Sequence, residues 1–429
     1  MKPLFFGGIH PSGHKELSAG VTTPAVLRPR QVIIPMQQHI GTACSPLVQV
    51  GDHVLRGQKI GDGEGLCVPV HASVSGIVAA VEPRPHPSGR IVMAVVIDND
   101  FEDRSVPAAP AEQKDADAVL RCIRQAGIVG MGGAAFPGSV KALSALGKAD
   151  TLIANACECE PYITADDTLL RTDPQQVLGG MELLRRLLEP KRTVLAVEDN
   201  KQGAIARLRE ILPDYSGIEL AVLPTRYPQG AEKQLIYSVT GREVPPGQLP
   251  VSVNCAVFNV STFAAVYRAV TLGMPVTSRI VTVSGEAVRQ PQNFVVPIGT
   301  PFRDLMEAAG GLTEDAGRVL SGGPMMGIAQ SDLSVPVVKA TNCVLCLPST
   351  SGTPENPVCI RCGKCVGVCP MGLLPLYLYR FREHAEQLKR LHGLDCIECG
   401  CCAYTCPGKL PLVEKIRGGK QILREAVGK

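Results

Sequence analysis

Two runs of cysteine near the C-terminal end constrain this chain more than any other feature. Both have the spacing Cys-x2-Cys-x2-Cys-x3-Cys-Pro, the first over residues 359–370 and the second over residues 396–407. Bacterial proteins bind 4Fe–4S clusters with this spacing, and the fourth cysteine of each run ligates the cluster of the other run. The predicted ligand sets are therefore Cys359, Cys362, Cys365 and Cys406 for one cluster, and Cys369, Cys396, Cys399 and Cys402 for the other.

Zinc is the alternative interpretation of these cysteines, but a zinc site needs only four ligands and has no use for a duplicated run. The chain has 17 cysteines, and 11 of them lie between Cys343 and Cys406. Such a concentration favours metal or cofactor ligation over disulfides. Cys401 is out of phase with its run, and we expect it to be a buried thiol that ligates nothing. The pair Cys343-x2-Cys346 stays open between ligands, a redox pair and core residues.

Composition excludes some classes of function. The chain of 429 residues has 43 Lys and Arg against 40 Asp and Glu, and it has no Trp. A near-balanced charge and scarce aromatic side chains argue against a nucleic-acid partner. No stretch of about 20 apolar residues is present, and the first residues lack a signal-peptide pattern. We therefore expect no transmembrane segment, and a cytosolic chain or one held at a membrane by partners.

A glycine-rich segment over residues 127–138 leads into a predicted helix from about Ser139 to Leu146. Such loops bring backbone N–H groups close to a phosphate, although this one is neither a dinucleotide fingerprint nor a P-loop, and a simple tight turn is the alternative. A predicted strand, Thr151–Ala156, precedes Glu158 and Glu160. Acidic groups beyond a strand end suit ribose hydroxyls or a carboxamide. The alternative is a solvated acidic loop.

Helices and strands alternate after this point. We predict a helix over Pro174–Leu188 and a strand over Ile218–Leu223, which indicates an α/β domain with parallel strands. Between the two cysteine runs, the pattern from Leu376 to His392 predicts one amphipathic helix. A helical linker of this kind favours a helical two-cluster module.

Further motifs make the chain recognisable. They are Phe6–Pro11, His71–Gly76, Glu158–Asp166, Glu198–Lys201, Tyr227–Gly230, Gly241–Pro245 and Gly322–Gly327. With the glycine-rich segment and both cysteine runs, nearly the whole chain resembles the RnfC family, whose members belong to Rnf complexes, the ion-translocating ferredoxin:NAD oxidoreductases. The central part is also similar to the flavin-binding subunit of respiratory complex I.

The resemblance implies bound FMN and NADH. It implies that FMN is cradled by Gly130, Gly132, Gly133 and Lys141, and that its ribityl and phosphate groups are contacted by Asn155, Asn259 and Thr262. It also implies a nicotinamide nucleotide pocket lined by Glu158, Glu160 and Glu232, of which Glu158 and Glu160 are the candidate catalytic residues. Cys157 departs from the pattern of the relatives, which puts a flavin contact there in doubt.

The resemblance further implies a multidomain α/β chain of four parts. They are a barrel-sandwich-like N-terminal domain over 1–105, an FMN/NADH-binding α/β domain over 106–274, a soluble-ligand-binding β-grasp domain over 275–335, and a ferredoxin-like domain with two 4Fe–4S clusters over 336–429. The N-terminal domain looks similar to a lipoyl-type domain around Gly51–Gly61. Ala72-Ser73-Val74 occupies the turn where a lipoyl lysine would sit, so we expect a structural or docking role.

The expected function follows. The chain would pass electrons between NAD(H) and, indirectly, ferredoxin through FMN and the two clusters. It would act as a peripheral protein on the cytoplasmic face of the membrane, beside the other Rnf subunits. Two alternatives stay open: a cobalamin reductase of a diol-utilisation microcompartment, which shares this architecture, and a non-enzymatic iron–sulfur relay whose flavin pocket no longer works.

Overall fold

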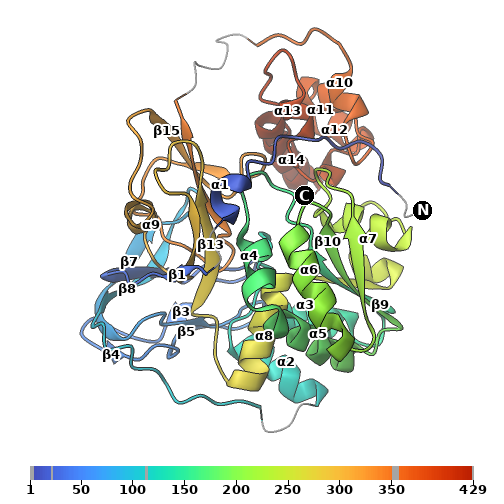
Figure 1. Cartoon of the computed structure of the whole chain (residues 1–429). Helices are drawn as coiled ribbons and strands as arrows, with labels where there is room; N and C mark the ends of the chain where they lie inside the picture. The colour runs from blue at the N-terminus through green and yellow to red at the C-terminus, as the bar shows by residue number, and fades with distance from the viewer. Residues whose placement is uncertain (1–3, 21–22, 112–114, 350–356, 428–429) are drawn as a thin grey trace.

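The computed structural model describes residues 4–20, 23–111, 115–349 and 357–427. A twisted parallel sheet with helices, two β-rich units and a small helical module pack around one another (Figure 1). Within the described residues, no helix combines the length and the apolar character that a membrane crossing requires.

The N-terminal unit is a sandwich of two antiparallel sheets. Their strands, in sheet order, are β2 (Gln31–Pro35), β8 (Ile91–Asn99), β7 (Gly76–Pro85) and β4 (His53–Val54), and then β3 (Ser45–Pro46), β5 (Lys59–Asp62) and β6 (Val70–His71). Alternation places Val32 and Ile34 in the core between the sheets, while Ile33 faces the other way. The lipoyl-like turn is buried, and Ser73 Oγ donates a hydrogen bond to the carbonyl of Ile298. This turn is therefore packed against the neighbouring unit.

The central unit is a four-stranded parallel sheet. Its order is β11 (Ile218–Leu223), β10 (Arg192–Glu198), β9 (Thr151–Ala156) and β12 (Cys255–Asn259). One face is covered by α2 (Ala116–Gln125), α3 (Gly138–Ala145), α5 (Pro174–Leu188), α6 (Gln202–Ile211) and α8 (Val260–Leu272). The other face is covered by α7 (Glu232–Thr240). The remaining elements here are α4 (Ala165–Thr172) and the 3-10 turns η1 (Leu212–Asp214) and η2 (Pro250–Val253). The predicted bounds of β9, β11 and α5 agree with the structure.

A six-stranded mixed sheet forms the third unit. Its order is β1 (Ala25–Val26), β14 (Gln292–Pro297), β13 (Ser278–Ser284), β17 (Cys343–Pro348), β15 (Ala316–Ser321) and β16 (Ile328–Gln330), and α9 (Phe302–Ala308) packs against it. Strand β17 lies in the segment expected to belong to the C-terminal domain, yet it pairs with β13 and β15. It holds Cys343 and Cys346, which are fully buried in two different apolar clusters. These two cysteines are core residues.

The C-terminal module is helical. It contains α10 (Lys364–Gly367), α11 (Pro375–Arg380), α12 (Ala385–Arg390), η3 (Gly393–Asp395), α13 (Cys401–Tyr404) and α14 (Leu412–Val427). The single helix predicted over Leu376–His392 is wrong, because the chain turns at residues 381–384 and forms α11 and α12 instead. This turn lets Leu378 and Leu388 both enter the apolar core against α14. Tertiary packing overrides the helical periodicity here.

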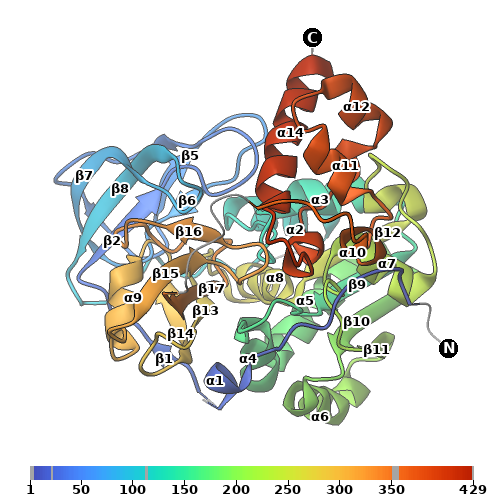
Figure 2. The same cartoon turned by 90° about the horizontal axis from the view of Figure 1, so that it is seen from above.

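The N-terminal segment crosses the molecule before it enters the sandwich (Figure 2). Gly8 N donates to Val368 O of the C-terminal module at 2.9 Å, and Ile9 pairs with Tyr227 of the central unit. The segment then forms α1 (Glu16–Ala19), which lies against β13 and β14. Residues 8–19 thus join three units.

Candidate functional site

The candidate site lies at the carboxyl end of the parallel sheet. Strand β9 has β10 on one side and β12 on the other, and the chain continues from β9 to β10 and β11 before it returns to β12. Such a reversal opens a crevice between β9 and β12, and α/β proteins bind ligands at such a position. Asn155 and Asn259 are register partners at the ends of β9 and β12. Both predicted asparagines therefore lie at the crevice.

The glycine loop, residues 127–138, lies above this edge. Thr262, which is buried at the start of α8, accepts a hydrogen bond from Met131 N at 3.0 Å and donates one to Val129 O at 3.3 Å. Gly132 and Gly133 are exposed on the other side of the loop. A Cβ at Gly132 would come within 3.2 Å of Asn259, and Gly133 has a φ of +123°. Thr262 thus holds one side of the loop, and the exposed backbone of Gly132 and Gly133 forms the other. This arrangement fits the close approach of a phosphate-bearing cofactor such as FMN.

Lys141 and Glu232 come together beside the loop. Lys141 Nζ of α3 donates to Glu232 Oε2 at the start of α7, at 2.7 Å. The ammonium also lies 5.6 Å from the ring centroid of Phe258. The pair places one positive and one negative group next to the crevice, so an anionic ligand at Lys141 would compete with Glu232.

The acidic turn, residues 157–164, follows β9. Asn155 supports it, because its amide donates to Gly230 O at 2.8 Å and its oxygen accepts from Cys157 N at 3.0 Å. Glu158 is buried and accepts hydrogen bonds from Asp166 N at 2.8 Å and Asp167 N at 3.4 Å, at the N-terminus of α4. Burial raises the pKa of Glu158 to about 7.

Glu160 has different surroundings. Its carboxylate accepts a hydrogen bond from Met325 N at 3.2 Å, and the Tyr227 hydroxyl oxygen lies 3.4 Å from it. Burial raises the pKa of Glu160 to about 7. Glu158 and Glu160 therefore point to separate partners, one toward α4 and the other toward the loop that carries Met325.

Asn259 and Cys157 have defined roles in the structure. Asn259 Nδ2 donates to Asp166 Oδ2 at 2.6 Å, and Ser261 Oγ donates to Asp166 Oδ1 at 2.8 Å. Both oxygens of the Asp166 carboxylate are thereby bound to the junction of β12 and α8, a connection that the sequence did not predict. Cys157 Sγ lies 3.5 Å from Ala196 O, in the core on the α7 side of the sheet. Its thiol is directed away from the glycine loop.

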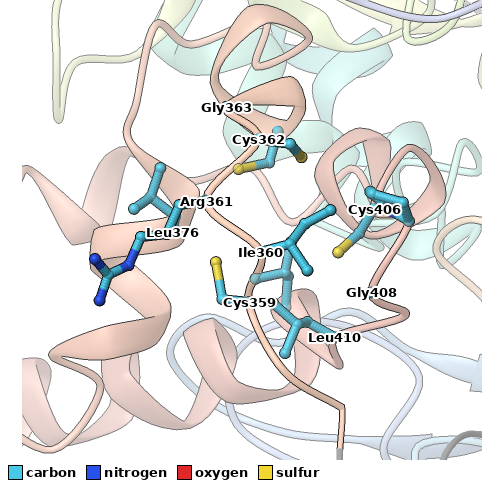
Figure 3. A pocket seen from close by; sticks show the side chains of 12 residues that line it. Cys359, Ile360, Arg361, Cys362, Gly363, Leu376, Cys406, Gly408 and Leu410 are labelled. Carbon is cyan, nitrogen blue, oxygen red and sulfur yellow. The ribbon is translucent and has the colours of Figure 1, made fainter.

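The cysteine runs surround two cavities in the C-terminal module. The outer cavity is shown in Figure 3 and is lined by Cys359, Cys362, Cys365 and Cys406. The inner cavity is lined by Cys369, Cys396, Cys399 and Cys402, and also by Cys401, and both cavities are partly open to solvent. Among the described residues, no three His, Cys, Asp or Glu side chains are close enough to hold a single metal ion. Four thiols around each space fit the donor set of a 4Fe–4S cluster.

The inner cavity lies against the central unit. The Tyr227 hydroxyl donates to Cys399 O at 2.7 Å, and Gln234 Nε2 donates to Pro370 O at 3.1 Å. Cys401 is fully buried, with its Sγ 4.0 Å from Tyr227 O. In contrast, Cys359 and Cys362 are exposed. The inner cavity therefore lies next to the candidate flavin site, and the outer cavity lies at the surface.

Comparison with known proteins agrees with this organisation. Four family models match in succession: the RnfC barrel sandwich hybrid domain over residues 4–102, the Nuo51 FMN-binding domain over 123–268, the SLBB domain over 280–329 and a 4Fe-4S dicluster domain over 358–409. The RnfC protein of the Na+-translocating ferredoxin:NAD+ oxidoreductase complex of Acetobacterium woodii is 45% identical over 97% of this chain and 96% of its own length. The chain belongs to the RnfC family.

Other members are longer. The RnfC protein of the ion-translocating oxidoreductase complex of Serratia proteamaculans is 44% identical over 97% of this chain, but over 60% of its own length. Among solved structures, an NAD+-reducing NiFe hydrogenase aligns with a TM-score of 0.49 and 22% identity over 74% of this chain and 63% of its own. As a member of the RnfC family, the chain is an electron-transfer subunit of an oxidoreductase complex. It combines an FMN-binding domain with a dicluster domain, which confirms the predicted fold class and cofactors.

Proposed function

We propose that this chain transfers electrons between NAD(H) and the single-electron carriers of its complex. When bound, FMN would supply hydride exchange with the nicotinamide and single-electron exchange with the clusters. The glycines Gly130, Gly132 and Gly133 and the side chains of Lys141, Asn155, Asn259 and Thr262 would hold it. Gly133 has open space where a Cβ would lie, Gly132 comes close to Asn259, and Thr262 fixes the loop through its hydrogen bond from Met131 N.

The nucleotide would bind beside the acidic turn, where we place Glu158, Glu160 and Glu232. Acceptor oxygens at this edge of the sheet suit ribose hydroxyls and would repel a 2′-phosphate. The cluster ligands would be the two sets of four thiols that line the outer and inner cavities. Cys401 also lines the inner cavity, but it is out of phase with the motif, so we assign it no ligand role.

The contact between Tyr227 and Cys399 carries this proposal. Tyr227 is buried, and its hydroxyl lies between the carboxylate of Glu160 and the backbone of Cys399. One side chain thus spans the acidic turn and the inner cavity. The order of electron flow that this favours is the flavin site, the inner cluster, and then the exposed outer cluster.

The experiment uses the holoprotein purified without oxygen. Addition of NADH should bleach the flavin and cluster absorbance together. In Cys402→Ala, which removes a thiol of the inner cavity, NADH should no longer reduce the outer cluster although dithionite still does. Cys401→Ala is the matched control and should behave as wild type. Rapid reduction of the outer cluster by NADH in Cys402→Ala would contradict the proposed order.

The relay alternative is tested by the same sample. A flavin content well below one per chain after gentle purification, with clusters that respond to dithionite but not to NADH, would favour a relay or a cobalamin reductase.

We further propose that the chain is peripheral, on the cytoplasmic face of the membrane, with ferredoxin reached through other Rnf subunits. The exposed outer cavity supports this, because an electron leaving the chain needs an accessible exit. Cross-linking in the intact complex would identify the Rnf protein that covers this cavity.

A further inference from the structure

Lys15 makes a set of contacts that the proposed function has not yet used. It lies just before α1, in the N-terminal segment, and its ammonium donates to three backbone carbonyls of the acidic turn. The distances are 2.8 Å to Glu158 O, 2.8 Å to Glu160 O and 2.7 Å to Ile163 O. An ammonium has three N–H donors, so all three are used on one turn.

The two residues before Lys15 hold the same turn. Gly13 O accepts a hydrogen bond from Tyr162 N at 2.7 Å, and the His14 ring stacks on the Tyr162 ring with centroids 4.7 Å apart. Tyr162 has a φ of +68°, which is unfavourable for a residue with a bulky side chain. The turn therefore adopts a conformation that depends on contacts from outside it, and the N-terminal segment supplies several of them.

The charges around Lys15 act in both directions: burial and Lys201 lower its pKa to about 8, while Glu158 and Glu198 favour its charged form. Glu158 and Glu198 are buried next to Lys15 and Lys201, and Lys201 Nζ is 4.0 Å from Glu158 Oε2. Two cations thus face two carboxylates in a region of low dielectric. Removal of Lys15 would leave three backbone carbonyls without their hydrogen-bond donor. It would also leave the negative charge of Glu158 with one cation fewer to balance it.

We infer that Lys15 is the positioning residue that fixes the backbone of Glu158 and Glu160 for binding of the nicotinamide nucleotide. It acts across a domain boundary, through main-chain carbonyls, and it does not itself touch the nucleotide. This inference rests on the proposed function, because it assigns Lys15 a role toward the same acidic turn.

The test compares Lys15→Met, which keeps the length of the side chain without its donors, with Lys15→Arg, which restores charge and donors. Lys148→Met changes an exposed lysine and serves as the matched control. For NADH oxidation with ferricyanide as acceptor, Lys15→Met should raise KM about tenfold, the effect of losing one or two charge-assisted hydrogen bonds. We expect kcat, flavin content and dithionite-reducible clusters to change little. Lys15→Arg should recover part of the loss, and Lys148→Met should match wild type.

A second readout does not depend on turnover. Hydrogen exchange of the peptide that spans residues 157–164 should accelerate in Lys15→Met and return toward wild type in Lys15→Arg. An unchanged KM together with unchanged exchange would overturn the inference, and so would a variant that loses the whole central domain. If wild type itself fails to oxidise NADH, the proposed function fails, and the exchange data alone then decide whether Lys15 positions the turn.

Discussion

Thr262 is the residue on which the shape of the glycine loop depends most directly. Its hydroxyl accepts from Met131 N and donates to Val129 O, and it is fully buried. Thr262→Val keeps the shape of the side chain, but the buried N–H of Met131 and the buried C=O of Val129 lose their hydrogen-bond partner. We expect a loss of about 1–3 kcal/mol in the free energy of unfolding and weaker flavin retention. Denaturant unfolding and flavin content check this, with the exposed Thr23→Val as control. Full flavin retention at wild-type stability would contradict the assigned role.

Glu158 gives the central domain a pH-dependent stability. Burial raises its pKa to about 7 in the folded chain, above the ordinary value near 4.5. Between these two values the folded state holds a proton that the unfolded state releases, so this contribution to stability is lost as pH rises toward 7. Glu158→Gln removes the titration. From about pH 5.5 to about pH 8, we expect the variant to gain stability relative to wild type by on the order of 1–3 kcal/mol.

Thermal or denaturant unfolding at several pH values measures this difference. Glu64→Gln changes an exposed side chain and is the control: its free energy of unfolding should differ from that of wild type by a constant amount over the same pH range. Parallel curves for Glu158→Gln and wild type would show that the carboxyl group of Glu158 titrates normally in the folded chain.

Local and long-range contacts at this scale differ in how well the sequence predicts them. The spacing of the cysteines groups the same eight thiols that line the two cavities, because each run forms a short loop. Lys15 carries no such signal. The partners of Lys15 and Tyr227 lie 143 and 172 residues away along the chain, and a hydrogen bond to a backbone carbonyl imposes no residue type on the partner. Tyr227 stands within the motif Tyr227–Gly230, and that motif is its only signal in the sequence.

The contact between α5 and α8 decides how the helices cover the sheet. Gly180 of α5 is buried against α8, and a Cβ there would lie 1.9 Å from Phe263 O. Because that atom belongs to the backbone, the helices would have to separate. We expect Gly180→Ala to destabilise the chain by about 1–3 kcal/mol. Gly418→Ala in α14 has open space around it and should stabilise α14 by about 0.5–1 kcal/mol. Unfolding midpoints measure both, and equal effects would refute the packing argument.

The elements themselves were predicted well where periodicity and tertiary burial agree. Strand β9 and helix α5 are apolar on the faces that they bury, and their predicted bounds are those of the structure. The prediction for residues 376–392 failed because their apolar side chains are periodic and yet both halves pack on α14. Strand β17 was missed since its partners, β13 and β15, lie outside its own segment.

At the scale of the whole molecule, the clusters should be structural as well as electronic. The core of the C-terminal module includes Cys369 and Cys402, with Cys365, Cys396 and Cys406 packed against it. A small module with a core of this kind is expected to depend on its metal. Removal of the clusters by oxidation and chelation should increase hydrogen exchange throughout residues 357–427 while the parallel sheet stays protected. Equal protection before and after removal would show that the module folds alone.

The crossing of the N-terminal segment also has a consequence for how the chain is made. Gly8 pairs with Val368, which the ribosome adds late, whereas Ile9 pairs with Tyr227 near the middle of the chain. The hydrogen bond between Gly8 and Val368 can therefore form only after the C-terminal module has been synthesised. The partners of Lys15, at residues 158–163, are synthesised much earlier, before β10, β11 and β12. Docking of the N-terminal segment should thus be completed only when the C-terminal module has folded around its clusters.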